Sequence, residues 1–138
     1  MKINITICLP RDATTVSIAR AVTADALRYL GVTSGCIEDI RLALSEACNN
    51  VIQHAATSDD YEVRFEVDGD ICIVSVRDTG TGADSSAFTG TLPDPDSSHG
   101  RGVVIMRALT DRAEFTSGRE IGTVVELAKR LEFLRPEP

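Results

Sequence analysis

The sequence lacks several features that would place it in a familiar class. No apolar run approaches the roughly 20 residues that a helix needs to cross a bilayer. The N-terminal stretch Met-Lys-Ile-Asn-Ile-Thr-Ile alternates in polarity instead of forming the apolar core of a signal peptide. None of the four cysteines (Cys8, Cys36, Cys48 and Cys72) sits at C-x-x-C spacing, which argues against a zinc site or a disulfide framework. We therefore expect a cytoplasmic protein with reduced thiols.

Basic residues are scarce as well. The chain of 138 residues has 14 lysines and arginines against 21 aspartates and glutamates, a formal net charge of −7. Nucleic acids and anionic membrane surfaces are bound largely through basic side chains, so this balance disfavours both as partners. A bound anionic small molecule would instead need a metal ion and backbone N–H groups.

Several short catalytic signatures are missing too. The sequence contains no Gly-Lys-Ser/Thr of a P-loop, no His-Arg-Asp or Asp-Phe-Gly, no Gly-x-Ser-x-Gly and no His-Glu-x-x-His. The corresponding NTPase, protein-kinase, hydrolase and zinc-protease classes therefore have no support. Apolar residues make up 43% of the chain, so a single domain spanning residues 1–138 with a real core is expected.

Hydrophobic periodicity predicts an alternation of strands and helices. The predicted strands cover residues 2–9, 61–67, 71–76, 113–116 and 123–128, and the predicted helices cover 14–30, about 35–55 and the segment after 102. Most strands after residue 60 are joined by hairpins. We therefore expect an α+β two-layer sandwich, whose mixed, largely antiparallel sheet is covered on one face by helices.

The boundaries of these elements carry further predictions. Gly31 is placed to end the first helix and Ser34 to cap the second. Residues 83–99 are rich in serine, proline and acids and are too long for an ordinary connection, so we expect a functional lid or a disordered loop. The charged tail from about residue 130 to 138 is expected to be frayed.

The helix over residues 35–55 has a polar face. Glu46, Asn50 and His54 are spaced i, i+4 and i+8 beside an apolar stripe. An acid and an amide are costly to bury without partners, and a bound ligand would supply them. A solvated polar edge is the alternative interpretation, and for His54 we favour a packed or capping role over a catalytic one.

Two glycine-rich segments follow. Residues 78–82 read Asp-Thr-Gly-Thr-Gly directly after a strand, where Asp78 could accept a hydrogen bond from an exocyclic amine such as that of adenine. The glycines would let the backbone approach a ring or a phosphate, although this pattern alone is also a common turn. Residues 100–102 read Gly-Arg-Gly at the start of a helix, where free N–H groups suit an anion.

Taken together, these segments resemble the four-motif signature of the gyrase, chaperone and histidine-kinase type of ATPase. In order along the chain, the motifs are Glu46-x-x-x-Asn50, Asp78-x-Gly80-x-Gly82, Gly100-x-Gly102 and Gly122-Thr123. Within that superfamily, a domain of this length with an N-terminal strand and helix resembles the bacterial anti-sigma factor serine kinases, which act by partner switching.

The resemblance implies roles for the first motifs. Asn50 would be a Mg²⁺ ligand, and Glu46 the general base that accepts the proton of the attacking hydroxyl. Asp78 would recognise adenine with the help of Thr123. Both ATP and Mg²⁺ are therefore implied as cofactors.

It also implies roles for the glycines and for two arginines. Gly80 and Gly82 would form the turn next to the adenine ring, and Gly100 and Gly102 the phosphate-facing start of a helix. Residues 83–99 would be the ATP lid, and Arg20 on the first helix would contact a partner. Some relatives have a basic residue where this chain has Ser98; His99 or Arg101 could take its place.

The function implied is an ATP-dependent protein serine kinase that phosphorylates an anti-anti-sigma factor and sequesters a sigma factor, as a homodimer. A nucleotide-gated anti-sigma module with little kinase activity is an alternative, which Ser98 supports. A catalytic fragment of a histidine kinase is another, although no phosphoacceptor-helix sequence precedes residue 30. A structural domain that binds no nucleotide is the remaining alternative.

Overall fold

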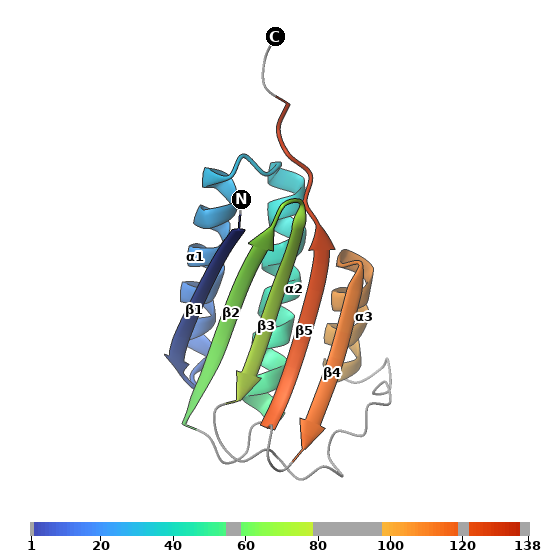
Figure 1. Cartoon of the computed structure of the whole chain (residues 1–138). Coiled ribbons are helices and arrows are strands. Elements are labelled where there is room, and N and C mark those ends of the chain that lie inside the picture. The colour runs from blue at the N-terminus through green and yellow to red at the C-terminus, as the bar shows by residue number, and fades with distance from the viewer. Residues whose placement is uncertain (1, 55–58, 79–97, 119–121, 136–138) are drawn as a thin grey trace.

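The computed structural model describes residues 2–54, 59–78, 98–118 and 122–135 (Figure 1). Along the chain, the described elements are β1 (Lys2–Pro10), a 3₁₀ turn (Ala13–Thr15), α1 (Val16–Tyr29), α2 (Ser34–His54), β2 (Asp60–Asp68), β3 (Ile71–Asp78), α3 (Ser98–Leu109), β4 (Arg112–Gly118) and β5 (Gly122–Arg130). Each predicted strand and helix is present, with boundaries shifted by a few residues.

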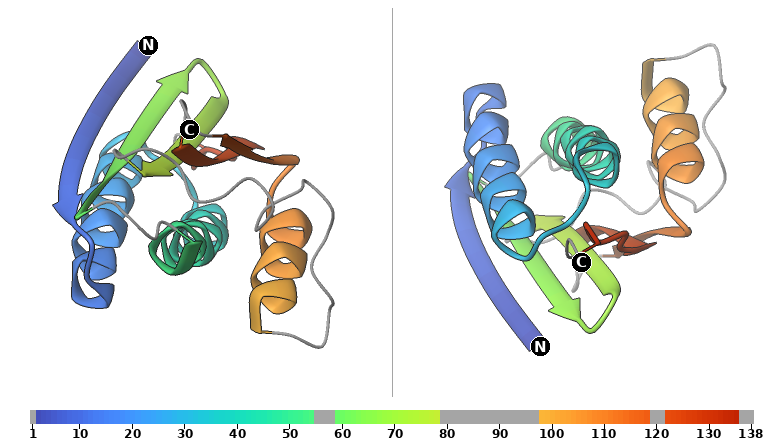
Figure 2. Two further views of the ribbon diagram at one scale, coloured as in Figure 1. Left: turned by 90° about the horizontal axis from the view of Figure 1, so that it is seen from below. Right: turned by 90° about the horizontal axis from the view of Figure 1, so that it is seen from above.

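The strands form one five-stranded sheet in the order β1-β2-β3-β5-β4. Every described pairing is antiparallel, so the sheet is more uniform than the mixed sheet that we expected. Two views along the sheet show that α1, α2 and α3 all lie on the same face (Figure 2). The predicted α+β two-layer sandwich is confirmed.

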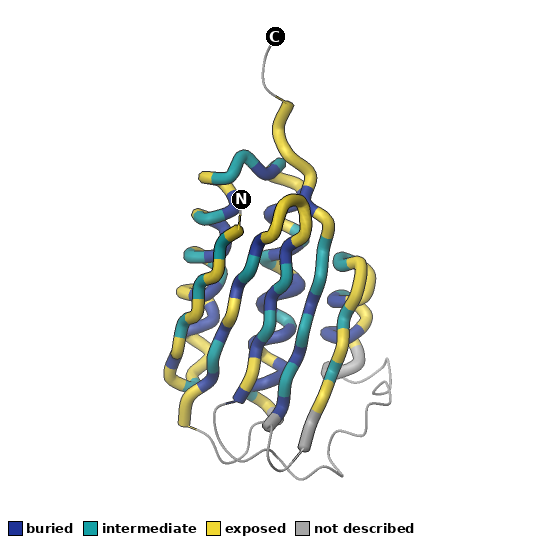
Figure 3. The backbone as a smooth tube through the Cα atoms, in the orientation of Figure 1, coloured by how far each residue is buried: buried dark blue, intermediate teal, exposed yellow. Residues whose placement is uncertain are grey.

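Alternation along the strands explains the two layers. In β2 the odd-numbered residues from Tyr61 to Val67 are buried, and the residues between them are half-buried or exposed (Figure 3). The register aligns Ile5 of β1 and Val74 of β3 with Phe65, so the apolar residues of neighbouring strands share the face under the helices. This face and α2 enclose the core.

The connection between α1 and α2 is set by local chemistry. Gly31 has φ of 82°, a left-handed conformation that glycine adopts without strain, and it ends α1 as predicted. The cap of α2 differs from the prediction, since Thr33 and not Ser34 provides it. The Cys36 N–H donates to Thr33 Oγ1 at 3.4 Å, which satisfies one of the free N–H groups of the first turn.

Residues 131–134 are not frayed, although they belong to the tail that we expected to be frayed; residues 136–138 of that tail lie outside the described residues. Leu131 is only 4% exposed, and its N–H donates to Asp70 O at 2.6 Å. Further on, Thr33 N–H donates to Glu132 O at 2.8 Å, and Leu134 N–H donates to Gly31 O at 2.7 Å. Residues 131–134 therefore lie against the α1–α2 connection because each segment satisfies backbone groups of the other.

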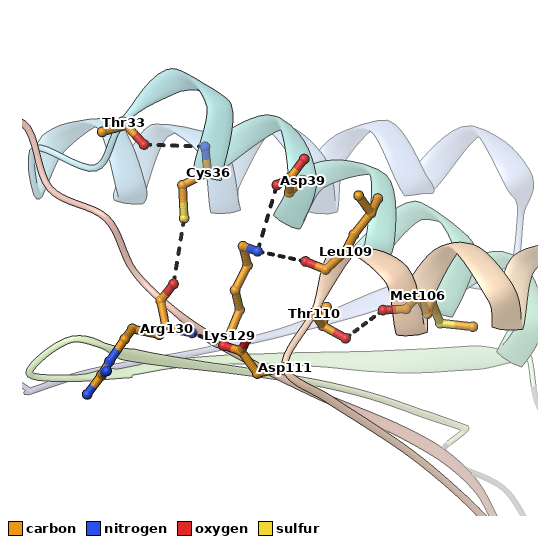
Figure 4. A network of polar contacts seen from close by, with 9 residues as sticks. All are labelled: Thr33, Cys36, Asp39, Met106, Leu109, Thr110, Asp111, Lys129 and Arg130. Atoms are coloured by element: carbon orange, nitrogen blue, oxygen red, sulfur yellow. Dashed lines mark hydrogen bonds and ion pairs between the residues drawn. The ribbon is translucent and has the colours of Figure 1, made fainter.

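A polar network fixes the junction between α3 and β4 against β5 (Figure 4). Lys129 Nζ donates to Leu109 O at 2.8 Å and lies 3.7 Å from Asp39 Oδ2. Asp111 Oδ2 accepts a hydrogen bond from Arg130 N at 2.6 Å. These contacts tie the end of α3 to α2 and to the central part of the sheet.

Two further observations concern the state of the cysteines and the length and polarity of the helices. All four cysteines are free, and burial raises the pKa of the Cys48 and Cys72 thiols to about 12 in each case, so both stay protonated. Among the described residues, no helix combines the length and the apolar character that crossing a membrane demands.

Candidate functional site

The C-terminal half of α2 places the predicted pair on one side of the helix. Ala47, Cys48 and Val51 are fully buried in the core. Glu46 is half-buried, and Asn50 follows one turn later with 5% of its surface exposed. The Asn50 Oδ1 atom is buried and has no hydrogen-bond partner in the described part of the chain. An amide oxygen in that position is available to a ligand.

Asp78 and Thr123 meet where two strands adjoin. Asp78 ends β3 and is 1% exposed, and Thr123 near the start of β5 is fully buried. Because Arg77 pairs with Val124, continuing the register by one residue brings Asp78 and Thr123 side by side on the face under the helices. The buried Thr123 Oγ1 also has no hydrogen-bond partner among the described residues.

The N-terminal part of α3 packs against α2 at Glu46. Gly102 of α3 is buried, and a Cβ atom added there would lie 2.9 Å from Glu46 Oε2. The two helices therefore come together at the predicted catalytic residue. Glu46 and Asn50 come from the C-terminal half of α2, Gly102 from the N-terminal part of α3, and Asp78 and Thr123 from adjoining strand ends. Figure 1 shows that α2 ends near the tip of the sheet where β3 finishes and β5 begins.

The other predicted site residues are distributed as follows. Gly80, Gly82 and most of the expected lid fall within residues 79–97, outside the described residues. The expected lid ends with Ser98 and His99, and the backbone of both residues is part of α3. Gly100 and Arg101 also lie in the first turn of α3, and Arg101 is exposed.

Arg20 lies near Glu46, which sequence reasoning did not predict. It comes from α1 and is half-buried. Together with Leu42, Ser45 and Glu46 of α2, it lines an open hollow of about 460 Å³. The predicted base and the predicted partner contact thus share one concave surface.

Tyr61 is a neighbour of the site that the sequence reasoning missed. It pairs with Asp78 in the β2–β3 register, and its hydroxyl lies 2.8 Å from Thr15 Oγ1. Burial raises the pKa of Tyr61 from its ordinary value. Counting back from the hairpin turn would have found this residue, because hairpin register fixes which residue faces Asp78.

The donor set suits a magnesium nucleotide. Mg²⁺ takes oxygen ligands, keeps several waters and shares phosphate oxygens, so it needs few groups from the protein. The Asn50 Oδ1, for which the described part of the chain supplies no hydrogen-bond partner, is one such oxygen. The Asp78 carboxylate and the Thr123 hydroxyl, buried side by side, are acceptors for an exocyclic amine.

Comparison with known protein families identifies the class. The model of the histidine kinase-like ATPase domain matches residues 9–129, which is most of the chain. The chain therefore belongs to the histidine kinase-like ATPase family. This confirms the resemblance that the four motifs indicated.

Individual relatives narrow the resemblance. The chain is 31% identical over 134 residues to the serine-protein kinase RsbW of Bacillus velezensis, covering 89% of this chain and 82% of that protein. It is 28% identical over 138 residues to RsbW of Halalkalibacterium halodurans, covering 94% and 84%. The predicted likeness to serine-protein kinases is thus confirmed.

A solved structure supports the fold. The crystal structure of the RsbU and RsbW domains of Rv1364c from Mycobacterium tuberculosis superposes with a TM-score of 0.72 at 24% identity. The match covers 94% of this chain and 32% of that one. At this identity the likeness concerns the fold alone.

Proposed function

We propose that this chain is an ATP-dependent protein serine kinase that phosphorylates an anti-anti-sigma factor and sequesters a sigma factor. The observation that carries the proposal is the buried Asn50 Oδ1, one helical turn from Glu46, which has no hydrogen-bond partner among the described residues. A buried polar atom without a partner costs about 1–3 kcal/mol, which a ligand on that atom would offset. Membership of the ATPase family and the serine-protein kinase relatives support the same assignment.

The residues of the site would divide the work. Asp78 and Thr123 would orient the adenine from the strand ends. Asn50 would hold Mg²⁺, which when bound neutralises charge on the phosphates. Glu46 would accept the proton of the serine hydroxyl as its oxygen attacks the terminal phosphate. Phosphoryl transfer depends mainly on such positioning and charge neutralisation.

The backbone of α3 would contribute at the phosphates. Gly100 and Arg101 lie in its first turn, where N–H groups have no partner within the helix. Such groups and the positive end of the helix dipole attract anions. The Arg101 side chain is exposed, so it or His99 could supply the charge that Ser98 lacks.

The partners would meet the hollow that Arg20 and Glu46 share. A protein that inserts its serine toward Glu46 through this hollow would contact the surface lined by Arg20 and Leu42. Leu42 is 47% exposed and offers an apolar contact beside the charges. Competition of the two protein partners for this surface would make the nucleotide state a switch. We also propose a homodimer in the cytoplasm on the basis of the family resemblance.

Nucleotide binding is the first test. Titration calorimetry of the full chain should show binding of Mg·ATP and Mg·ADP, and binding should weaken when EDTA removes the metal. A radiolabelled transfer assay on a small protein captured from the native cytosol then tests the kinase. No heat of binding at millimolar nucleotide would remove the proposal. Binding of a sigma factor without any phosphate transfer would instead indicate a nucleotide-gated binding module.

A further inference from the structure

Gly102 is surrounded in an unusual way. It lies on the side of α3 that is buried, as do Val103 and Met106. A Cβ atom at this position would approach Glu46 Oε2 to 2.9 Å, and Glu46 Cβ and Cδ to 3.8 Å each. These three nearest atoms all belong to the Glu46 side chain. A side chain at residue 102 would therefore meet the Glu46 carboxylate first.

Contact with a phosphate does not explain this glycine. Counted from Ser98, Gly102 is the fifth residue of α3. The N–H groups that a helix leaves free belong to its first four residues, so the Gly102 N–H falls within the helical hydrogen-bond ladder. The space left by the missing side chain is instead occupied by the end of Glu46.

We propose that Gly102 is a positioning residue for Glu46. Its lack of a side chain leaves room for the carboxylate at the point where α2 and α3 meet. The proposal rests on the function proposed above, in which this carboxylate accepts the serine proton. A side chain at residue 102 would push the carboxylate aside. Because the atom that must move is the end of a flexible side chain, the fold would survive the change.

The first experiment compares two Gly→Ala variants of the full chain. Gly102→Ala should lower kcat for phosphate transfer by about 100-fold, since a misplacement of about 1 Å can cost that much, and the KM for ATP should stay within about 2-fold. Gly35→Ala is the matched control. Gly35 also lies in a helix, yet a Cβ there meets nothing within 4 Å. It should transfer phosphate at the wild-type rate. A loss of ATP affinity with normal kcat in Gly102→Ala would assign Gly102 to the phosphates and overturn the proposal.

Shortening the base should remove the effect of the Gly102→Ala change. Glu46→Asp withdraws the carboxylate by one methylene group from the position that an alanine at residue 102 would occupy. Adding Gly102→Ala to Glu46→Asp should then change kcat by less than about 2-fold, since coupled residues do not give additive losses. A further loss of about 100-fold in the double variant would show that Gly102 acts independently of Glu46.

A measurement without catalysis separates this proposal from the proposed function. In the nucleotide-free protein, the carboxyl ¹³C resonance of Glu46 can be assigned by its disappearance in Glu46→Gln. Gly102→Ala should shift this resonance, and Gly35→Ala should leave it in place. An unmoved resonance in Gly102→Ala overturns the positioning role even if the wild type is a kinase. If Gly102→Ala shifts the resonance but the wild type transfers no phosphate, the contact between Gly102 and Glu46 is upheld and the proposed kinase function is wrong.

Discussion

The two ends of the sheet differ in how far their buried polar groups are hydrogen-bonded. At the closed end, comprising the β2–β3 turn, residues 30–34 and residues 131–134, backbone groups bond to one another across the chain. At the open end, comprising Glu46, Asn50, Asp78, Gly102 and Thr123, buried oxygens of Asn50 and Thr123 have no hydrogen-bond partner among the described residues. Figure 1 shows these ends at opposite tips of β3.

The difference separates stability from binding. Hydrogen bonds at the closed end hold distant segments together, and each contributes about 0.5–1.5 kcal/mol net to the free energy of unfolding. The Asn50 and Thr123 oxygens at the open end, which have no hydrogen-bond partner among the described residues, act against stability instead. We therefore expect variants at the open end to change ligand binding or transfer, and variants at the closed end to change the free energy of unfolding.

The largest effect should come from the predicted base at the open end. Glu46→Gln keeps the size and helix propensity of the side chain and removes only the proton acceptor. The rate of phosphate transfer should fall by about 10²–10⁴-fold, and ATP affinity should persist. Single-turnover transfer and calorimetry measure the two quantities. Glu132→Gln at the closed end is the control, since its side chain is exposed. Wild-type transfer by Glu46→Gln would mean that another group takes the proton.

The next largest effect should come from the apolar anchor of the closed end. Leu131→Ala removes a side chain that is 4% exposed and should destabilise the fold by about 2–5 kcal/mol. Urea unfolding measures the loss, and nucleotide affinity of the folded protein should not change. Leu134→Ala, at a position 65% exposed, should stay within about 0.5 kcal/mol of wild type. Equal losses for both variants would mean that residues 131–134 are not anchored through Leu131.

A smaller effect should follow from the strand-end acid at the open end. Asp78→Asn should weaken nucleotide binding by about 1.5–3 kcal/mol, the scale of a hydrogen bond that involves a charged group. Asp68→Asn is the control because Asp68 ends β2 at the closed end and is exposed. Calorimetry compares the two dissociation constants. If both variants bind as the wild type does, Asp78 only forms the turn.

Much of the open end could be predicted because its signals are local. Glu46 and Asn50 lie one turn apart on any helix, and Asp78 comes two residues after Val76, the last β-branched residue of β3. The contact of Gly102 with Glu46 could not be predicted, since a missing side chain leaves no pattern that tells a packing neighbour from a phosphate. The sharing of one hollow by Arg20 and Glu46 depends on how α1 packs beside α2.

The closed end was predicted less well because its contacts join distant segments. The charged composition after residue 130 indicated fraying, and the hydrogen bonds from Thr33 and Leu134 to the opposite segment have no signature in either segment alone. We assigned the cap to Ser34, but Thr33 is adjacent and threonine also caps helices well, so the residue types alone could not exclude Thr33. The structure decides in favour of Thr33.

The choice of cap gives the smallest and most local test. Thr33→Ala removes the oxygen that accepts from Cys36 N, and should destabilise the protein by about 0.5–1 kcal/mol. We place it at the low end of the range for caps because the bond is long, at 3.4 Å. Ser34→Ala removes an exposed hydroxyl from the first helical residue and should change stability by less than about 0.5 kcal/mol. Urea unfolding of both variants against wild type measures the difference, and neither should alter ATP affinity, since α2 reaches the open end only several turns later. A larger loss for Ser34→Ala would return the cap to the residue that the sequence first indicated.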